Sequence, residues 1–165
     1  MPTEPRTEAG ATDRAWPVLP QVYAANCRTA EWAVPDRPTT VFCLSRTLPG
    51  PDVYDRARAP LSGVLHRPFT YWESADPVTL LDRLVQEISD CATREQTVVH
   101  CTLGLDRTGV VALALLLRDA SGLGDALRRY QARGVRLPRE DAMDVLTRYA
   151  HGEPWTARKE AGHAH

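Results

Sequence analysis

The segment that most constrains this chain is a short apolar run ending at a cysteine, followed at once by a tight loop and a longer apolar run. The first run, Val98 to Cys101, is rich in β-branched residues, which indicates a buried strand. The second run, Val110 to Leu117, is long enough for a helix that opens near Arg107. The sequence therefore predicts a strand, a loop and a helix in immediate succession.

This arrangement predicts an anion site with a nucleophile inside it. The first turn of a helix points unpaired backbone N–H groups, and the positive end of the helix dipole, toward the preceding loop. The same field favours the thiolate form of Cys101, which is its nucleophilic form. The planar guanidinium of Arg107 can hold two oxygens of one phosphate, and Gly104 lets the loop adopt a positive φ that turns its amides inward.

The ten residues from His100 to Gly109 follow the pattern His-Cys-x-x-Gly-x-x-Arg-Thr-Gly. This pattern resembles the signature of the cysteine-dependent protein tyrosine phosphatase superfamily, in its dual-specificity and phosphoinositide-phosphatase branch. The resemblance implies that Cys101 attacks phosphorus to form a phosphocysteine and that Arg107 clamps the phosphate. It also implies that His100 orients the loop from behind and that the Thr108 hydroxyl steadies the thiolate. The implied phosphate cradle consists of the backbone amides of Thr102, Leu103, Gly104, Leu105, Asp106 and Arg107.

The residue that protonates the leaving group does not follow the usual pattern of this branch. The resemblance places an aspartate about thirty residues before the cysteine, in a Pro-x-x-Asp context, but counting from Pro68 puts Tyr71 at that position. Asp106 is our first candidate, since relatives such as the myotubularin-like lipid phosphatases also carry an aspartate immediately before this arginine. Glu73 and Asp76 are the alternatives. Asp106 can instead pair with Arg107 or cap the following helix, and Asp76 is well placed as a helix cap.

Composition excludes several other classes of protein. The length of 165 residues, with 43% hydrophobic and 25% charged residues, is typical of one globular domain. A net charge of −1 gives no general attraction to nucleic acid, and no apolar run is long enough to span a membrane. The four cysteines lack the spacing of a zinc site, so we expect no metal and no cofactor. One of the four thiols must stay free and reduced, and the cytoplasm keeps thiols reduced, so we expect a cytoplasmic protein.

The order of the expected elements predicts an α/β fold: a central, mainly parallel sheet of four to five strands flanked by helices. The resemblance implies the same architecture, that of the dual-specificity phosphatases. We expect residues 16–151 to form the phosphatase domain, between disordered tails at 1–15 and 152–165. Strands are predicted at Gln21–Ala24, Thr39–Leu44, Ser62–His66 and Gln96–His100, and helices at Pro77–Ala92, Thr108–Arg118, Gly122–Gly134 and Arg139–Tyr149.

Three functions stay open at this point. The first is a protein tyrosine or dual-specificity phosphatase, for which Tyr71 and Trp72 can stack on an aromatic substrate. The second is a phosphoinositide or inositol phosphate phosphatase, disfavoured because Leu105 stands where such enzymes often have lysine, although Arg136 and Arg139 can approach the mouth. The third is a pseudo-phosphatase that only binds phosphorylated partners. The oligomeric state stays open, as does a regulatory disulfide of Cys101 with Cys43 or Cys91.

Overall fold

The computed structural model describes residues 15–27, 29, 32, 36–55, 59–102 and 105–156. Its centre is a five-stranded sheet in the order β1-β2-β5-β3-β4. All neighbouring strands run parallel except β1, which pairs antiparallel with β2. The strands are β1 (Trp16–Leu19), β2 (Val22–Asn26), β3 (Thr39–Cys43), β4 (Leu61–His66) and β5 (Gln96–Cys101).

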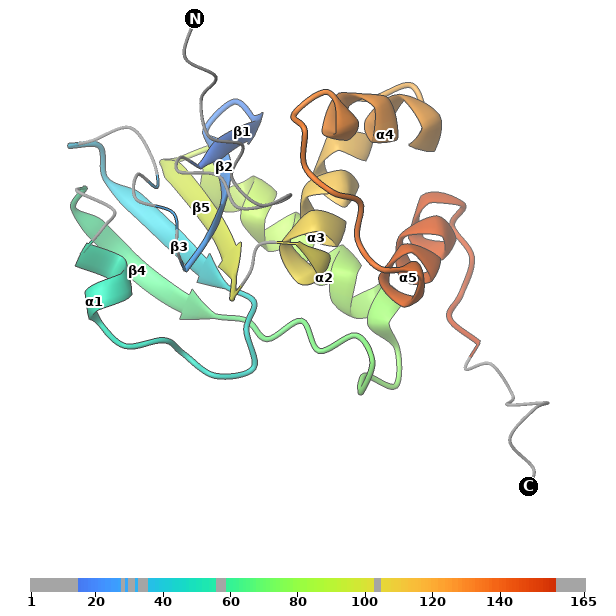
Figure 1. Ribbon diagram of the computed structural model, residues 1–165, viewed down its shortest axis with the longest axis horizontal. Helices are drawn as coiled ribbons and strands as arrows, with labels where there is room; N and C mark the ends of the chain where they lie inside the picture. The colour runs from blue at the N-terminus through green and yellow to red at the C-terminus, as the bar shows by residue number, and fades with distance from the viewer. Residues whose placement is uncertain are drawn as a thin grey trace, which may run out of the picture.

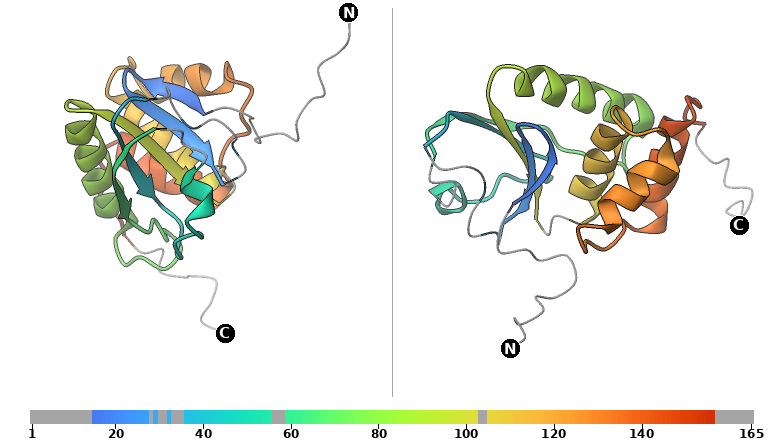
Figure 2. Two further views of the ribbon diagram at one scale, coloured as in Figure 1. Left: turned by 90° about the vertical axis from the view of Figure 1, so that its left-hand side faces the viewer. Right: turned by 90° about the horizontal axis from the view of Figure 1, so that it is seen from above.

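The helices form two unequal layers on this sheet, as Figures 1 and 2 show. Of the helices among the described residues, the four longer ones lie on one face and a single short one lies on the other. The helices are α1 (Asp52–Asp55), α2 (Pro77–Ala92), α3 (Asp106–Leu117), α4 (Leu123–Gln131) and α5 (Glu140–Ala150), and α1 is the one on the second face. The predicted α/β architecture with a mainly parallel sheet is confirmed.

The central strand β5 is buried along its whole length, because the sheet is covered on both faces. Its side chains alternate between the two layers. Val99 and Cys101 belong to the large core beneath the helices, whereas Val98 packs with Trp32 in a small core on the α1 side. This alternation also separates Cys101 from its neighbour His100, whose ring lies with Trp32.

The helix α3 is apolar around its whole circumference because it packs on the sheet and on three other helices. Every residue from Thr108 to Leu116 is buried. Gly109 permits the closest of these contacts, since a Cβ there would come within 2.7 Å of the Tyr130 hydroxyl and 2.9 Å of Pro138 Cγ. The absence of a side chain at Gly109 therefore lets the segment after α4 lie against the first turn of α3.

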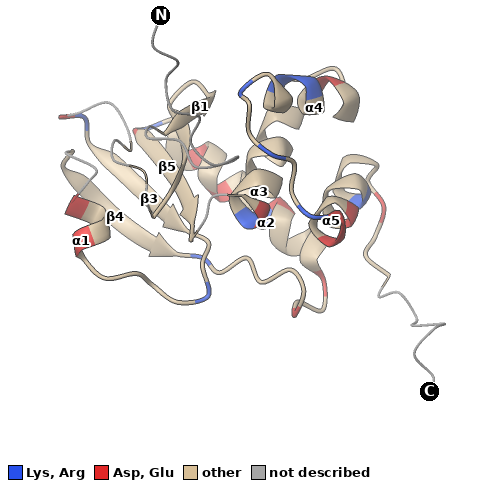
Figure 3. Ribbon diagram, in the orientation of Figure 1, with Lys and Arg blue, Asp and Glu red and all other residues tan. Residues whose placement is uncertain are grey.

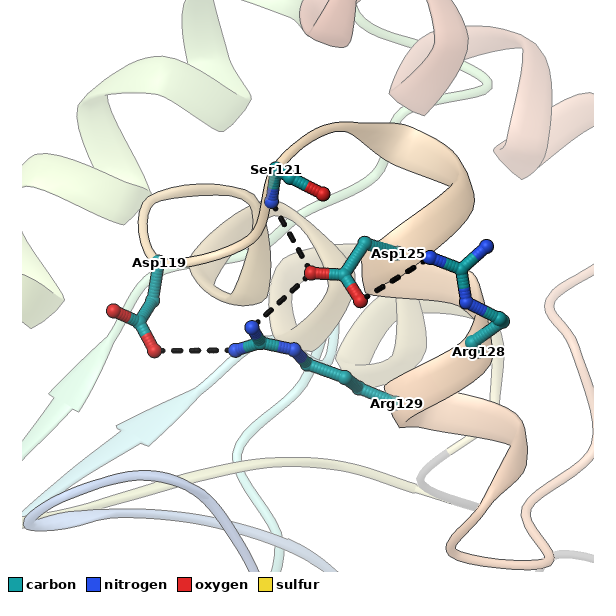
Figure 4. Close-up of polar contacts among 5 residues, drawn as sticks. All are labelled: Asp119, Ser121, Asp125, Arg128 and Arg129. Atoms are coloured by element: carbon teal, nitrogen blue, oxygen red, sulfur yellow. Dashed lines mark hydrogen bonds and ion pairs between the residues drawn. The ribbon is translucent and has the colours of Figure 1, made fainter.

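The connection from α3 to α4 is fixed by an ion-pair network, drawn in Figure 4. Arg129 bridges Asp119 in the connection and Asp125 in α4, each at 3.1 Å. Asp125 also accepts a hydrogen bond from the Ser121 amide, which satisfies one of the unpaired donors at the start of α4. The arginines of this helix give the exposed side of α4 its basic character, visible in Figure 3.

The ends of the expected domain lie close to the ends of the described chain. Trp155 follows the last helix and packs against the main core, with the Arg148 guanidinium 5.2 Å from its ring. Residues 1–14 and 157–165, which make up most of the predicted tails, lie outside the described residues. Within the described part of the chain, no helix has the length and apolarity to cross a membrane.

Candidate active site

The predicted nucleophile lies where the central strand gives way to the central helix. Cys101 is the last residue of β5 and is almost fully buried, and α3 begins at Asp106. The loop is thus at the carboxyl end of a parallel sheet, where open α/β folds bind ligands. Arg107 lies in the first turn of α3. Of the predicted cradle, Leu103 and Gly104 lie outside the described residues.

The first residue of the loop is held by the two strands that flank β5. The Thr102 carbonyl accepts a hydrogen bond of 3.2 Å from the Cys27 amide, which follows β2. The Thr102 hydroxyl lies 3.2 Å from that of Ser45, which follows β3. One contact holds the backbone of Thr102 and the other holds its side chain, so the residue directly after Cys101 is tied to both neighbouring strands.

His100 supports the loop from the opposite face of the sheet. Its ring is fully buried, lies 4.7 Å from the Trp32 ring, and has Nε2 3.1 Å from the Tyr54 hydroxyl. Its Nδ1 lies 3.3 Å from the Cys101 carbonyl oxygen. Because a carbonyl can only accept, Nδ1 must carry the hydrogen, and Nε2 then accepts from Tyr54. His100 is therefore a neutral ring that fixes the backbone of the nucleophile.

Burial lowers the pKa of His100 to about 4; the positive charge of Arg107 adds to this shift, and the Cys101 carbonyl opposes it. The unfolded chain therefore binds a proton at this residue below about pH 6.5, whereas the folded chain does not. We expect the free energy of unfolding to fall by about 2 kcal/mol between pH 7.5 and pH 5 from this residue alone.

Urea unfolding at the two pH values checks this prediction. The control is His100→Asn, which keeps a donor near the Cys101 carbonyl but does not titrate. The variant should be less stable at pH 7.5 yet lose less stability on acidification. An equal loss in both proteins would contradict the assignment of the pH dependence to His100.

The mouth of the site carries an exposed aromatic side chain above the arginine. The Arg107 guanidinium carbon lies 5.7 Å from the centre of the Trp72 ring, and Trp72 is 52% exposed. This distance is within the range of a cation–π contact, so the Trp72 ring lies next to the positive charge of Arg107. Next to Trp72, an ion pair between Glu73 and Arg46 joins the loop after β4 to the loop after β3.

The three candidate acids lie in different environments. Asp76 caps α2: its oxygens accept from the Thr79 hydroxyl at 2.7 Å and the Thr79 amide at 3.0 Å, and these bonds lower the pKa of Asp76. Glu73 is paired with Arg46. Asp106 lies in the first turn of α3, directly before Arg107, and its Oδ1 accepts a 2.8 Å hydrogen bond from the Arg139 amide. Of the three, Asp106 is the one that lies in the segment from Cys101 to Arg107.

Tyr71, at the position where the resemblance expects an acid, is a buried residue. Its hydroxyl lies 3.4 Å from Asp141 Oδ1, at the start of α5. Burial raises the pKa of Tyr71 to about 12, and the negative charges of Asp141 and Asp106 add to this effect. Tyr71 thus stays a phenol that donates to Asp141. Of the two aromatic residues expected at the mouth, Trp72 is the exposed one and Tyr71 is part of the core.

The remaining predicted participants are buried around the loop. The Thr108 hydroxyl, at the start of α3, finds no hydrogen-bond partner among the described residues. Cys43 pairs in register with His100 and influences the pKa of Tyr54, so it lies on the α1 side of the sheet, whereas Cys101 faces the helices. Cys91 is buried in α2. In the described part of the chain, no three His, Cys, Asp or Glu side chains gather as a metal site requires.

Several functional neighbours were not foreseen from sequence. Trp32 and Tyr54 come from segments with weak secondary-structure signals, and only the folded sheet brings them to His100. Arg139 contributes a backbone amide, which no sequence pattern reveals. Asp141 looked like an ordinary acidic residue in the first turn of a helix.

Comparisons with known proteins give a family match for part of the chain and a shared fold. A family model described as the tyrosine phosphatase family matches residues 70–123, a span that contains Tyr71, the cysteine loop and α3. Comparison with curated proteins gives no match.

Among solved structures, a mouse putative dual specificity phosphatase in complex with zinc tungstate is 23% identical with a TM-score of 0.66, over 90% of this chain and 94% of that one. Human DUSP28 is 20% identical with a TM-score of 0.67, over 88% and 98% of the two chains. The human tyrosine phosphatase-like serine/threonine/tyrosine-interacting protein is 14% identical with a TM-score of 0.60, over 84% and 96%. At these identities the likeness establishes the fold.

Proposed function

We propose that this chain is a member of the cysteine-dependent tyrosine phosphatase superfamily, in its dual-specificity-like branch, and that it hydrolyses phosphomonoesters through a phosphocysteine intermediate. The family-model match over residues 70–123 and the fold shared with dual-specificity phosphatases support this proposal. The observation that carries this proposal is the position of Cys101 at the end of the central strand, directly before a helix whose first turn holds Arg107. That position gives a thiolate and a bound phosphate the same stabilising helix N-terminus.

The reaction we propose has two steps. In the first, the Cys101 sulfur forms a bond to phosphorus while the ester bond to the leaving oxygen breaks, and Asp106 gives its proton to that oxygen. In the second, water attacks phosphorus, returns a proton to the Asp106 carboxylate and releases the Cys101 thiolate. Arg107 and the loop amides hold the equatorial oxygens in both steps. The buried Thr108 hydroxyl is available to donate to the sulfur when it leaves.

We propose phosphotyrosine in a protein as the substrate, ahead of alkyl phosphates. Trp72 is a large apolar side chain left exposed beside Arg107, so an aromatic ring carrying the bound phosphate would cover it. A phosphoinositide or inositol phosphate needs further cations around the ring, and Leu105 supplies none within the loop. We place the protein in the cytoplasm, where its four thiols stay reduced.

Hydrolysis of a phosphotyrosine peptide, a phosphothreonine peptide and a short-chain phosphoinositide, with a metal chelator present, tests the function and the substrate class together. We expect turnover without metal and the highest kcat/KM for the phosphotyrosine peptide. Higher kcat/KM for the phosphoinositide would favour the lipid alternative. Micromolar binding of the phosphopeptide without turnover would favour a phosphate-reading pseudo-phosphatase, as the replacement of the usual acid by Tyr71 would permit.

Asp106→Asn tests the proposed acid. The variant should lower kcat/KM, which reports the first step alone, by about 10²- to 10⁴-fold for phenyl phosphate, whose leaving group needs a proton, and far less for p-nitrophenyl phosphate. The basic limb of the pH–rate profile should disappear with it.

Glu73→Gln and Asp76→Asn are the matched controls for this variant. If either of them, rather than Asp106→Asn, removes the leaving-group dependence and the basic limb, the acid lies on the loop after β4 and the assignment to Asp106 is wrong.

A further inference from the structure

The loop between α4 and α5 contributes a backbone group to the proposed reaction. We infer that the amide of Arg139 is a positioning group for Asp106: by occupying Oδ1, it directs the proton of the carboxylic acid to Oδ2. The inference rests on the proposed function, in which Asp106 is the acid. It assigns a role to a segment that lies more than thirty positions after the cysteine loop in sequence.

The contact itself is short and defined. The Arg139 nitrogen lies 2.8 Å from Asp106 Oδ1, within the range of a strong amide–carboxyl hydrogen bond. An amide can only donate, so the oxygen that it binds must act as an acceptor. Because the carbonyl oxygen of a carboxylic acid is a better acceptor than its hydroxyl oxygen, the amide favours the acid with its hydrogen on Oδ2, where it can protonate a leaving group.

The segment that carries this amide is held against α3 independently of Asp106. Pro138 packs on Gly109, where a Cβ would come within 2.9 Å of its ring. The buried Tyr130 hydroxyl donates to the Arg136 carbonyl at 3.3 Å. Burial raises the pKa of Tyr130, and the negative charges of Cys101 and Asp106 add to this, so its hydroxyl stays protonated and remains a donor close to the loop. The amide is therefore presented by a rigid surface.

The side chain of Arg139 plays a separate part. Its Nε lies 3.8 Å from Asp141 Oδ1, the same oxygen that accepts from the Tyr71 hydroxyl. Both partners are substantially exposed to solvent, so this ion pair adds little to stability. The amide and the side chain can thus be tested apart, because one belongs to the backbone and the other does not.

Arg139→Pro removes the amide hydrogen and leaves the backbone path intact. Residue 139 has φ −60° and ψ 157°, which proline adopts without strain. The ring carbon takes the place of the hydrogen that now points at Asp106, so the carboxyl group must turn away. The matched control is Arg139→Ala, which loses the ion pair with Asp141 and keeps the amide.

We expect Arg139→Pro to behave as Asp106→Asn does: about 10²- to 10⁴-fold lower kcat/KM for phenyl phosphate, a much smaller loss of kcat/KM for p-nitrophenyl phosphate, and no basic limb in the pH profile of kcat/KM. Arg139→Ala should keep the wild-type pH profile and leaving-group dependence. Combining Arg139→Pro with Asp106→Asn should add no further loss, since both changes disable the same proton transfer. Equal effects of the proline and alanine variants, or additive losses, would overturn the inference.

Two readouts keep the test decisive. The burst of p-nitrophenol reports phosphocysteine formation, so its presence in Arg139→Pro shows an intact nucleophile, and the absence of both burst and turnover from the wild type would refute the proposed function instead. In the wild-type protein, the NMR resonance of the Arg139 amide should titrate with the basic limb of the rate profile and stop doing so in Asp106→Asn. If the chemical shift of the Arg139 amide does not change over the pH range of the basic limb, the inference is contradicted, even if the proline variant fails to fold.

Discussion

Replacing Cys101 with serine is expected to abolish both the burst and the steady-state hydrolysis of an aryl phosphate, with a loss of kcat on the order of 10⁶-fold, as when another enzyme loses its covalent nucleophile. The reason is chemical, since a serine hydroxyl is a much weaker nucleophile than a cysteine thiol at neutral pH. His100, the nearest imidazole in sequence, is on the opposite face of the sheet and donates to a carbonyl.

The control for this experiment is Cys91→Ser, a buried thiol of α2 that the proposed reaction does not use. It should retain the burst and most of the rate. The Cys101→Ser protein should still bind the phosphotyrosine peptide, which can be measured by isothermal titration. Persistent turnover of Cys101→Ser, with an unchanged burst, would rule out a phosphocysteine intermediate.

Arg107→Lys is expected to cost about 10³- to 10⁵-fold in kcat, the range associated with an arginine that stabilises a transferring phosphoryl group. Lysine keeps the charge but loses the planar fork that binds two oxygens together.

Steady-state kinetics and inhibition by orthovanadate measure this loss, because vanadate takes the place of the phosphoryl group in the cradle. Inhibition should weaken in parallel with kcat in Arg107→Lys. Arg128→Lys, on the exposed side of α4, is the matched control and should match the wild type in both measurements. A rate loss with undiminished vanadate binding would show that the guanidinium acts elsewhere than on the phosphoryl oxygens.

The fold was largely predictable because its main elements are strongly patterned. The helix α2 begins with a capping aspartate and a proline, and its apolar residues recur at helical spacing, so its predicted and observed bounds agree. The strand β5 was foreseen from its β-branched run. The edge strand β1 was not foreseen, since it contains Pro17 and acquires its conformation only by pairing with β2.

The site was predictable where chemistry is local in sequence and not where it depends on the fold. Cys101, Arg107 and Asp106 occupy one short segment, so their pattern could be recognised. The partners of His100 are separated from it by dozens of residues. No pattern around Tyr54 predicts that its hydroxyl contacts Nε2 of His100. Tyr71 and Trp72 are neighbours with similar side chains, and only packing decides that the first is buried and the second exposed.

The bond between Asp106 and the start of α5 has a consequence for how such a chain can evolve. Since the donor is a backbone N–H, every amino acid except proline can provide it. This contact therefore does not constrain which side chain residue 139 carries. Natural selection on this contact would therefore act on the path of the loop and on the small size of residue 109, which lets the loop approach. Homologues could share the device while their aligned sequences show no common residue at the position that supplies it.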